Sequence, residues 1–106
     1  MLAEAHLSAI IQSSDDAIIS KDLSGTVLSW NPAATRIFGF SEAEMVGQSI
    51  RKLIPDDRQT EEDVILARIA RGDRVQSFDT VRQRSDGTPI HVSLTISPLS
   101  LIHISE

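Results

Sequence analysis

Residues 17–48 read AIISKDLSGTVLSWNPAATRIFGFSEAEMVGQ, and this stretch decides the fold. It opens with two short apolar runs, 17–21 and 26–30, which are separated by the sequence Asp-Leu-Ser-Gly. Gly25 ends that separation and suits the positive φ that a tight turn demands. Two short strands joined by such a turn form a β-hairpin, so the sequence predicts a hairpin at the start of this stretch.

The second half of the same stretch predicts two short helices. Asn31 is suited to cap the free N–H groups of a first turn, and Pro32 suits the first helical position. The helix that they begin ends at Gly39, because glycine readily takes the left-handed conformation of a C-terminal cap. The sequence Ser-Glu-Ala-Glu at 41–44 is a capping box for a second helix, which ends near Gly47.

Further along the chain, the pattern predicts a helical turn, a longer helix and a second hairpin. The helical turn covers 49–54 and is closed by a proline. The longest helix covers 57–71, with a broad apolar arc made of Val64, Ile65, Leu66, Ala67, Ile69 and Ala70. Strands are expected at 75–84 and 88–98, on either side of a tight Asp-Gly turn.

The strand at 88–98 has the clearest two-residue period in the chain. Its alternating apolar residues are Ile90, Val92, Leu94 and Ile96. One face of this strand is therefore expected to be buried and the other wet. The register of the strand at 75–84 is ambiguous, because Phe78 and Val81 point to opposite faces of a regular strand.

Both ends of the chain differ from this central pattern. Residues 1–14 are expected to form a leader or connector helix, because apolar residues recur at helical spacing between 2 and 13. The segment LSLIHISE at 99–106 matches one reading frame of a transposase mosaic-end adapter, so we interpret it as an adapter-derived tail. The alternative is a native strand, because the segment is apolar and partly alternating. Under the adapter interpretation, His103 has no functional meaning.

Composition excludes several classes of protein. A chain of 106 residues fits one domain of modest size with a thin core. The absence of Cys excludes disulfides, thiolate catalysis and Cys-ligated metals. A net charge of −5 disfavours nucleic acid as a partner. No apolar run approaches the length of a membrane span, so we expect no membrane contact from this segment.

The order of the elements resembles the PAS sensor domain over about residues 5–98. The motifs that carry the resemblance are Ser29-Trp-Asn-Pro32, Ile37-Phe-Gly39, Glu44-Met-Val-Gly47, Leu53-Ile-Pro55 and Arg84-Ser-Asp-Gly87. Each motif alone is weak, but their order and spacing together are specific. They are most similar to the PAS modules of bacterial sensor histidine kinases, and sometimes of diguanylate cyclases.

The resemblance implies an α+β fold with a five-stranded antiparallel sheet of order 2-1-5-4-3 and helices on one face. The PAS domain then covers residues 15–98 and is incomplete at its C-terminus, with the fifth strand missing or replaced by the tail. Without that strand, the strands at 17–21 and 88–98 keep bare edges inside the sheet. We therefore expect the chain to be marginally stable and prone to aggregate.

In PAS sensors, a ligand pocket lies between the sheet and the helices, so the resemblance implies a pocket wall in this chain. The candidate residues are Trp30, Ile37, Leu53, Ile54, Val64, Ile65, Ile69, Phe78, Leu94 and Ile96. The alternative is that these residues form plain hydrophobic core. Likewise, Trp30 either stacks on a ligand ring or packs in the core.

Two cofactor classes of PAS domains lack their matching residues here. Haem-binding members supply an axial His from the long helix, but no His lies within 55–74, and the matching turn carries Glu61 and Glu62. His6 and His91 are expected at the surface. Photoreactive flavin members use a Cys, so covalent flavin photochemistry is excluded, whereas non-covalent flavin stays open.

No catalytic or metal site is expected. The sequence has no nucleophile elbow, phosphate loop or paired-His metal motif, and the carboxylate pairs at 15–16 and 56–57 suit turns and caps. The segment is therefore predicted to be no enzyme, but a cytoplasmic input domain of a sensor histidine kinase that detects a small ligand or redox state. The alternatives are a ligand-free dimerisation or relay spacer and an input domain of a diguanylate cyclase. The expected partners are a small molecule, a second copy bound through the leader helix, and a downstream output domain of the same chain.

Overall fold

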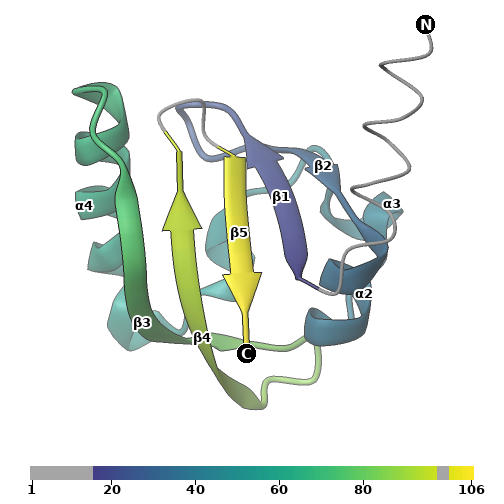
Figure 1. Ribbon diagram of the computed structural model, residues 1–106. Helices are drawn as coiled ribbons and strands as arrows, with labels where there is room; N and C mark the ends of the chain where they lie inside the picture. Colours follow the sequence, from purple (N-terminus) through teal and green to yellow (C-terminus); the bar gives the residue numbers. More distant parts are fainter. Residues whose placement is uncertain (1–15, 98–100) are drawn as a thin grey trace, which may run out of the picture.

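The computed structural model describes residues 16–97 and 101–106 of the chain. They contain an antiparallel sheet in the order β2-β1-β5-β4-β3. The strands are β1 (Ala17–Lys21), β2 (Val27–Trp30), β3 (Val75–Gln83), β4 (Pro89–Ile96) and β5 (Leu101–Ser105). Figure 1 shows β5, in yellow, between β1 and β4. The predicted fold class and strand order are confirmed.

Helical segments fill the connection between β2 and β3. They are α2 (Pro32–Phe38), α3 (Glu42–Met45), the 3-10 helices η1 (Ile50–Leu53) and η2 (Asp56–Arg58), and α4 (Gln59–Ala70). In Figure 1, α4 lies beside β3, whereas α2 and α3 lie near β1 and β2. Side chains from the sheet and the helices meet in one hydrophobic core. None of the helices in residues 16–97 combines the length and apolar composition that a membrane span needs.

The strands β4 and β5 both show the two-residue alternation of half-buried strands. The buried residues are Ile90, Val92, Leu94 and Ile96 of β4, and Ile102 and Ile104 of β5. His91 and His103 lie between them on the opposite face of the sheet and are exposed. The predicted alternation of β4 and the surface position of His91 are confirmed.

The central strand, β5, is built from the segment that we interpret as an adapter-derived tail. Ile104 pairs with Ala17 of β1 on one side and with Leu94 of β4 on the other. Residues 101–105 therefore supply the fifth strand, which agrees both with a tail that replaces it and with a native strand. The bare edges expected in the absence of a fifth strand do not occur on β1 and β4, because the alternating pattern of LSLIHISE suits a half-buried strand whatever the origin of its coding DNA.

The two short helices begin and end where the sequence predicts. The Asn31 side chain accepts a hydrogen bond from the Ala34 N–H at 3.0 Å, and Gly39 closes α2 with a φ of 79°. Ser41 and Glu44 form a complete capping box: the Glu44 N–H donates to Ser41 Oγ at 3.1 Å, and the Ser41 N–H donates to Glu44 Oε1 at 2.8 Å. These local hydrogen bonds fix the residues at which both helices begin.

Asn31 also joins α2 to β1. Its Oδ1 accepts a second hydrogen bond, from the Ile18 N–H at 3.0 Å, and its Nδ2 donates to the Asp16 carbonyl at 2.9 Å. Asn31 is buried. In Asn31→Ala, the backbone groups that it binds therefore lose their hydrogen-bond partner, and water cannot readily replace it. We expect this variant to lose about 2–4 kcal/mol of unfolding free energy, as measured by urea denaturation.

The matched control for this prediction is Ser49→Ala. Ser49 is also a helix N-cap, accepting from the Arg51 N–H at 3.1 Å, but this hydrogen bond is exposed. Its loss is expected to cost at most about 1 kcal/mol. Equal losses from the two variants would show that Asn31 acts as a cap alone and does not join the two elements.

The helix α4 presents a narrower buried surface than predicted. Glu62, Ile65 and Ile69 are its buried residues, and they lie on one stripe of the helix. Val64 is 56% exposed, so the predicted broad apolar arc is wrong. The reason is that residues 64–70 are apolar around most of the helix, and the position of the sheet decides which of them face inward. Two isoleucines and one carboxylate therefore hold α4 to the core.

An irregularity in β3 resolves the ambiguous register of that strand. The pairing with β4 shifts between Val75 and Phe78, and Ser77 within the shift has a φ of 52°. Beyond the shift, Phe78, Thr80 and Arg82 pair with inward-facing residues of β4. Two polar side chains of β3 consequently join the inner face of the sheet.

Candidate functional site

The sheet, η1 and α4 surround a small cavity of about 20 Å³. It is lined by Lys21, Ile50, Leu53, Ile54, Glu62, Ile65, Arg82, Leu94, Ile96, Ile102 and Ile104. A cavity of this volume is about large enough for one water molecule. Most of the wall is aliphatic, but Lys21, Glu62 and Arg82 bring charged groups to it.

Part of the predicted pocket wall surrounds this cavity. The predicted residues that line it are Leu53, Ile54, Ile65, Leu94 and Ile96. Ile37 and Ile69 belong to the same hydrophobic core but do not line the cavity, and Phe78 packs against that core. The predicted place of Val64 in the wall is wrong, because this residue lies on the exposed side of α4.

Trp30 lies in the core, away from the cavity wall. Its ring packs near Phe38, with 5.9 Å between the ring centroids. Its indole Nε1–H donates to the Phe40 carbonyl at 3.0 Å and to Thr35 Oγ1 at 3.1 Å. Because both the ring and its polar atom have protein partners, this geometry favours the packing role of Trp30 over stacking on a ligand.

The most unusual feature of the cavity is a buried ion pair that joins β1 to α4. Lys21 Nζ lies 2.7 Å from Glu62 Oε2, and the two side chains are 1% and 3% exposed. Removing two charges from water has a desolvation cost that their mutual attraction only partly offsets. This core therefore contains an arrangement that simple apolar packing would avoid.

Sequence reasoning missed both partners of this ion pair. A two-residue period in β1 places Lys21 on the same face as the buried Ala17 and Ile19, and this signal was sufficient to find it. Glu62 is buried on α4 although it is a charged residue. No local signal identifies Glu62, since its partner comes from a distant strand.

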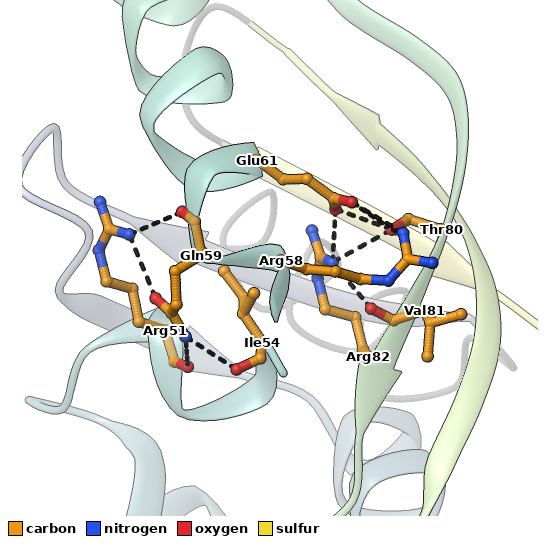
Figure 2. A network of polar contacts seen from close by, with 8 residues as sticks. All are labelled: Arg51, Ile54, Arg58, Gln59, Glu61, Thr80, Val81 and Arg82. Atoms are coloured by element: carbon orange, nitrogen blue, oxygen red, sulfur yellow. Dashed lines mark hydrogen bonds and ion pairs between the residues drawn. The ribbon is translucent and has the colours of Figure 1, made fainter. Parts of the chain in front are cut away.

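A second polar cluster joins α4 to β3, and Figure 2 shows its side chains converging on Glu61. Glu61 Oε1 accepts from Arg82 Nη1 at 2.8 Å and from Thr80 Oγ1 at 2.7 Å. Glu61 Oε2 accepts from Arg58 Nη1 at 2.9 Å. Arg82 Nη1 also donates to the Val81 carbonyl at 2.9 Å. The cluster thereby places a buried guanidinium at the cavity wall.

These contacts also set the protonation state of Glu61. Burial raises the pKa of its carboxyl group, but hydrogen bonds from Arg82, Thr80 and Arg58 outweigh burial and hold the pKa below its usual value. Because the folded pKa is lower than the unfolded one, ionised Glu61 stabilises the fold fully above the unfolded pKa. This contribution is lost as the pH falls through the lowered folded pKa.

We expect Glu61→Gln to lower the free energy of unfolding at neutral pH by about 1–3 kcal/mol, because charge-assisted hydrogen bonds are lost. The difference from the parent should shrink as the pH falls from the ordinary Glu pKa of 4.5 through the lower pKa of folded Glu61, and disappear below it. Urea denaturation at a series of pH values measures this. Asp63→Asn, in the exposed pair with Arg51, is the control and should change little. A difference that stays constant into strong acid contradicts the role of Glu61.

A third group of contacts, also drawn in Figure 2, fixes η1 to the start of α4. Arg51 Nη1 donates to the Gln59 carbonyl at 3.0 Å and to Gln59 Oε1 at 3.2 Å. Gln59 Nε2 in turn donates to the Ile54 carbonyl at 2.8 Å. Since Ile54 lines the cavity, these contacts position one of its walls.

The polar side chains that line the cavity are one amine, one carboxylate and one guanidinium. Within the described ranges, no three His, Asp or Glu side chains gather as a metal site. Asp56 and Asp57 lie in the exposed first turn of η2, and His91 lies on the opposite face of the sheet from the cavity. His6 lies outside the described residues. What the cavity offers is an apolar wall with a few buried charges.

Comparison with known proteins gives the family of this fold. The family model for the PAS fold matches residues 5–103. The chain belongs to the PAS family. A solved PAS domain of Colwellia psychrerythraea has the same fold, with a TM-score of 0.84, 17% identity, and coverage of 100% of this chain and 96% of that one. The resemblance inferred from the sequence motifs is therefore confirmed.

Two curated relatives of this PAS domain are sensor proteins. The sensor protein FixL of Bradyrhizobium diazoefficiens is 32% identical over 97 residues, which cover 86% of this chain and 19% of the relative. The sensor histidine kinase TmoS of Ectopseudomonas mendocina is 27% identical over 99 residues, which cover 92% of this chain and 10% of the relative. The chain thus spans a fifth or less of the length of these relatives.

Proposed function

We propose that this PAS domain is the cytoplasmic input module of a bacterial sensor histidine kinase and that it responds to a small ligand or a redox change. The observation that carries the proposal is the buried Lys21–Glu62 pair beside the cavity. An apolar pair of similar volume would suit a purely structural core at least as well. The similarity to sensor proteins supports the kinase as output.

The position of the pair suggests how a signal leaves the cavity. Lys21 lies on β1, which pairs with the central strand β5, and Glu62 lies on α4. An event that changes this contact shifts α4 between two ways of packing against the sheet. The two packings make different contacts with the output domain, and this difference carries the signal. Dimerisation through residues 2–13 belongs to the same proposal and concerns residues outside the described ranges.

A ligand-free relay spacer is the second candidate function. The observation that favours it is the small volume of the cavity, which leaves little free space for a ligand in this conformation. A spacer transmits changes from neighbouring domains and needs no pocket. An input domain of a diguanylate cyclase is the third alternative, and it differs from the first only in the output domain.

The identity of the output domain is tested on the source DNA. Resequencing across the codons for Pro98 and Leu99 is expected to show that a different coding sequence follows Pro98. That sequence should encode an apolar strand and then a kinase domain. That result also supports an adapter origin for residues 99–106. A cyclase domain would replace the proposed output, and a gene that ends at or near LSLIHISE contradicts both the adapter origin and the kinase.

The input role is tested on the full-length protein that the resequenced gene encodes. The double variant Lys21→Met/Glu62→Leu is expected to change the rate of autophosphorylation at least threefold, because it removes the contact between β1 and α4. The control is Arg71→Ser/Asp73→Ser, which removes an exposed pair on the far end of α4 and should leave the rate unchanged. Equal rates in the parent and both variants contradict an input role.

A further inference from the structure

The outward side of α4 is apolar in its middle and open to solvent. Val64 is 56% exposed, and Ala67 and Ala70 are exposed as well. At about 100° per residue, Ala67 lies on the side of the helix opposite Ile65 and Ile69, which face the core. Figure 1 shows α4 at one edge of the molecule. We call the three exposed residues the outer face of α4.

The two short helices of the domain differ from α4 in this respect. Their exposed residues include Thr35 and Arg36 of α2 and Glu42 and Glu44 of α3, as expected for helix surfaces that stay in water. The middle of the outer face of α4 instead carries a valine and two alanines. A centre that lacks charged residues is typical of a surface that another protein covers.

Exposed charges of opposite sign lie at the two ends of this face. The two aspartates of η2 and Asp63 lie at its start, whereas Arg68 and Arg74 lie at its end. Arg71 and Asp73 pair with each other and add no net charge there. Two helices that pack antiparallel bring the start of one beside the end of the other, so a second copy of α4 matches this surface in charge. A surface that complements itself in this way suits a dimer with twofold symmetry.

From this arrangement, we propose that two copies of the chain associate through the outer faces of their α4 helices, packed antiparallel about a twofold axis near Ala67. An alanine at the crossing point lets the helices approach closely, and Val64 packs near Ala70 of the second copy. The contact goes beyond the proposed sensory function and uses a surface other than residues 2–13. Because α4 also carries Glu62, the contact joins the cavity walls of the two copies.

The expected dimer is weak. Two helices of 12 residues bury less surface than the roughly 1,200–2,000 Å² of a standard interface. We therefore expect a Kd of about 0.1–1 mM for the 106-residue chain. In a longer chain whose copies are held together elsewhere, the effective concentration is on the order of millimolar, and such a contact is then populated.

Sedimentation equilibrium of the 106-residue chain up to about 1 mM measures this association. The decisive variants are Ala67→Glu and Ala67→Lys, because position 67 faces position 67 of the second copy across the twofold axis. Each variant alone sets like charges against each other, and we expect its Kd to rise at least about fivefold. An equimolar mixture of the two variants brings opposite charges together and should associate at least as tightly as the parent. Glutamate and lysine are both good helix formers, so both variants should fold, which circular dichroism checks.

The matched controls are Ala43→Glu and Ala43→Lys, which make the same changes at an exposed alanine of α3 and should keep the parent Kd. A parent chain that stays monomeric at about 1 mM overturns the proposal. So does a dimer whose Kd is the same in the Ala67 variants as in the parent, because it then uses another surface. A mixture of the two Ala67 variants that associates no more tightly than either variant alone overturns the twofold contact at this position.

Discussion

Lys21→Met is expected to lose about 3–5 kcal/mol of unfolding free energy, a large share of the total stability of a small domain. The variant keeps Glu62 buried, with 3% of its side chain exposed, and removes the cation that faces it. Arg82 is the other cation that lines the cavity, and its guanidinium is already paired with Glu61. An uncompensated buried carboxylate costs much more than the original pair contributed.

The double variant Lys21→Met/Glu62→Leu separates this explanation from a general intolerance to mutation. It replaces both charges by apolar groups of similar volume, so we expect its stability to return to within about 1 kcal/mol of the parent or to exceed it. Urea denaturation followed by the fluorescence of Trp30, the single tryptophan and a buried one, measures all three proteins. If the double variant is as unstable as Lys21→Met, the unpaired charge is not the cause.

Ending the chain after Ser97 is expected to abolish cooperative folding. The strand β5 carries the pairings of both β1 and β4, so its removal leaves two separate two-stranded ribbons. Such ribbons are marginally stable in water, and their exposed edges favour aggregation. The core also loses Ile102 and Ile104. Size-exclusion chromatography and the near-ultraviolet circular dichroism of the truncated chain measure the effect.

Two point variants within β5 show whether the loss of folding is caused by the loss of the strand or merely by the shorter chain. Ile102→Asp places a carboxylate in the core and should unfold the protein, whereas His103→Asp places the same group on the exposed face and should be tolerated. A soluble, cooperatively melting truncated chain would instead mean that β1 and β4 hold together without β5.

The parts of this fold that sequence reasoning predicted are those determined by local interactions. The caps at Asn31 and Ser41 each satisfy N–H groups within a few residues, and the alternation of β4 is visible without knowledge of its neighbours. The order of strands came from the family resemblance rather than from the chemistry of the residues. Local patterns alone do not decide how distant strands pair.

The parts that sequence reasoning missed depend on contacts between distant elements. Val64 and Ile65 are both apolar, and only the location of the sheet determines that the first is exposed and the second buried. The position of Phe78 depends on the irregularity at Ser77, a non-glycine residue with positive φ that no turn motif marks. Glu62 is buried because a lysine from another element faces it.

The central place of β5 has a consequence for the speed of folding. β3 and β4 form a hairpin of near neighbours in sequence, but β1 finds its partner β5 at nearly the opposite end of the described chain. Pairings between residues so distant must first overcome the entropy of closing a long loop, which slows folding. The β3–β4 hairpin is therefore suited to form early, and the docking of β1 against β5 to be the late, rate-limiting step.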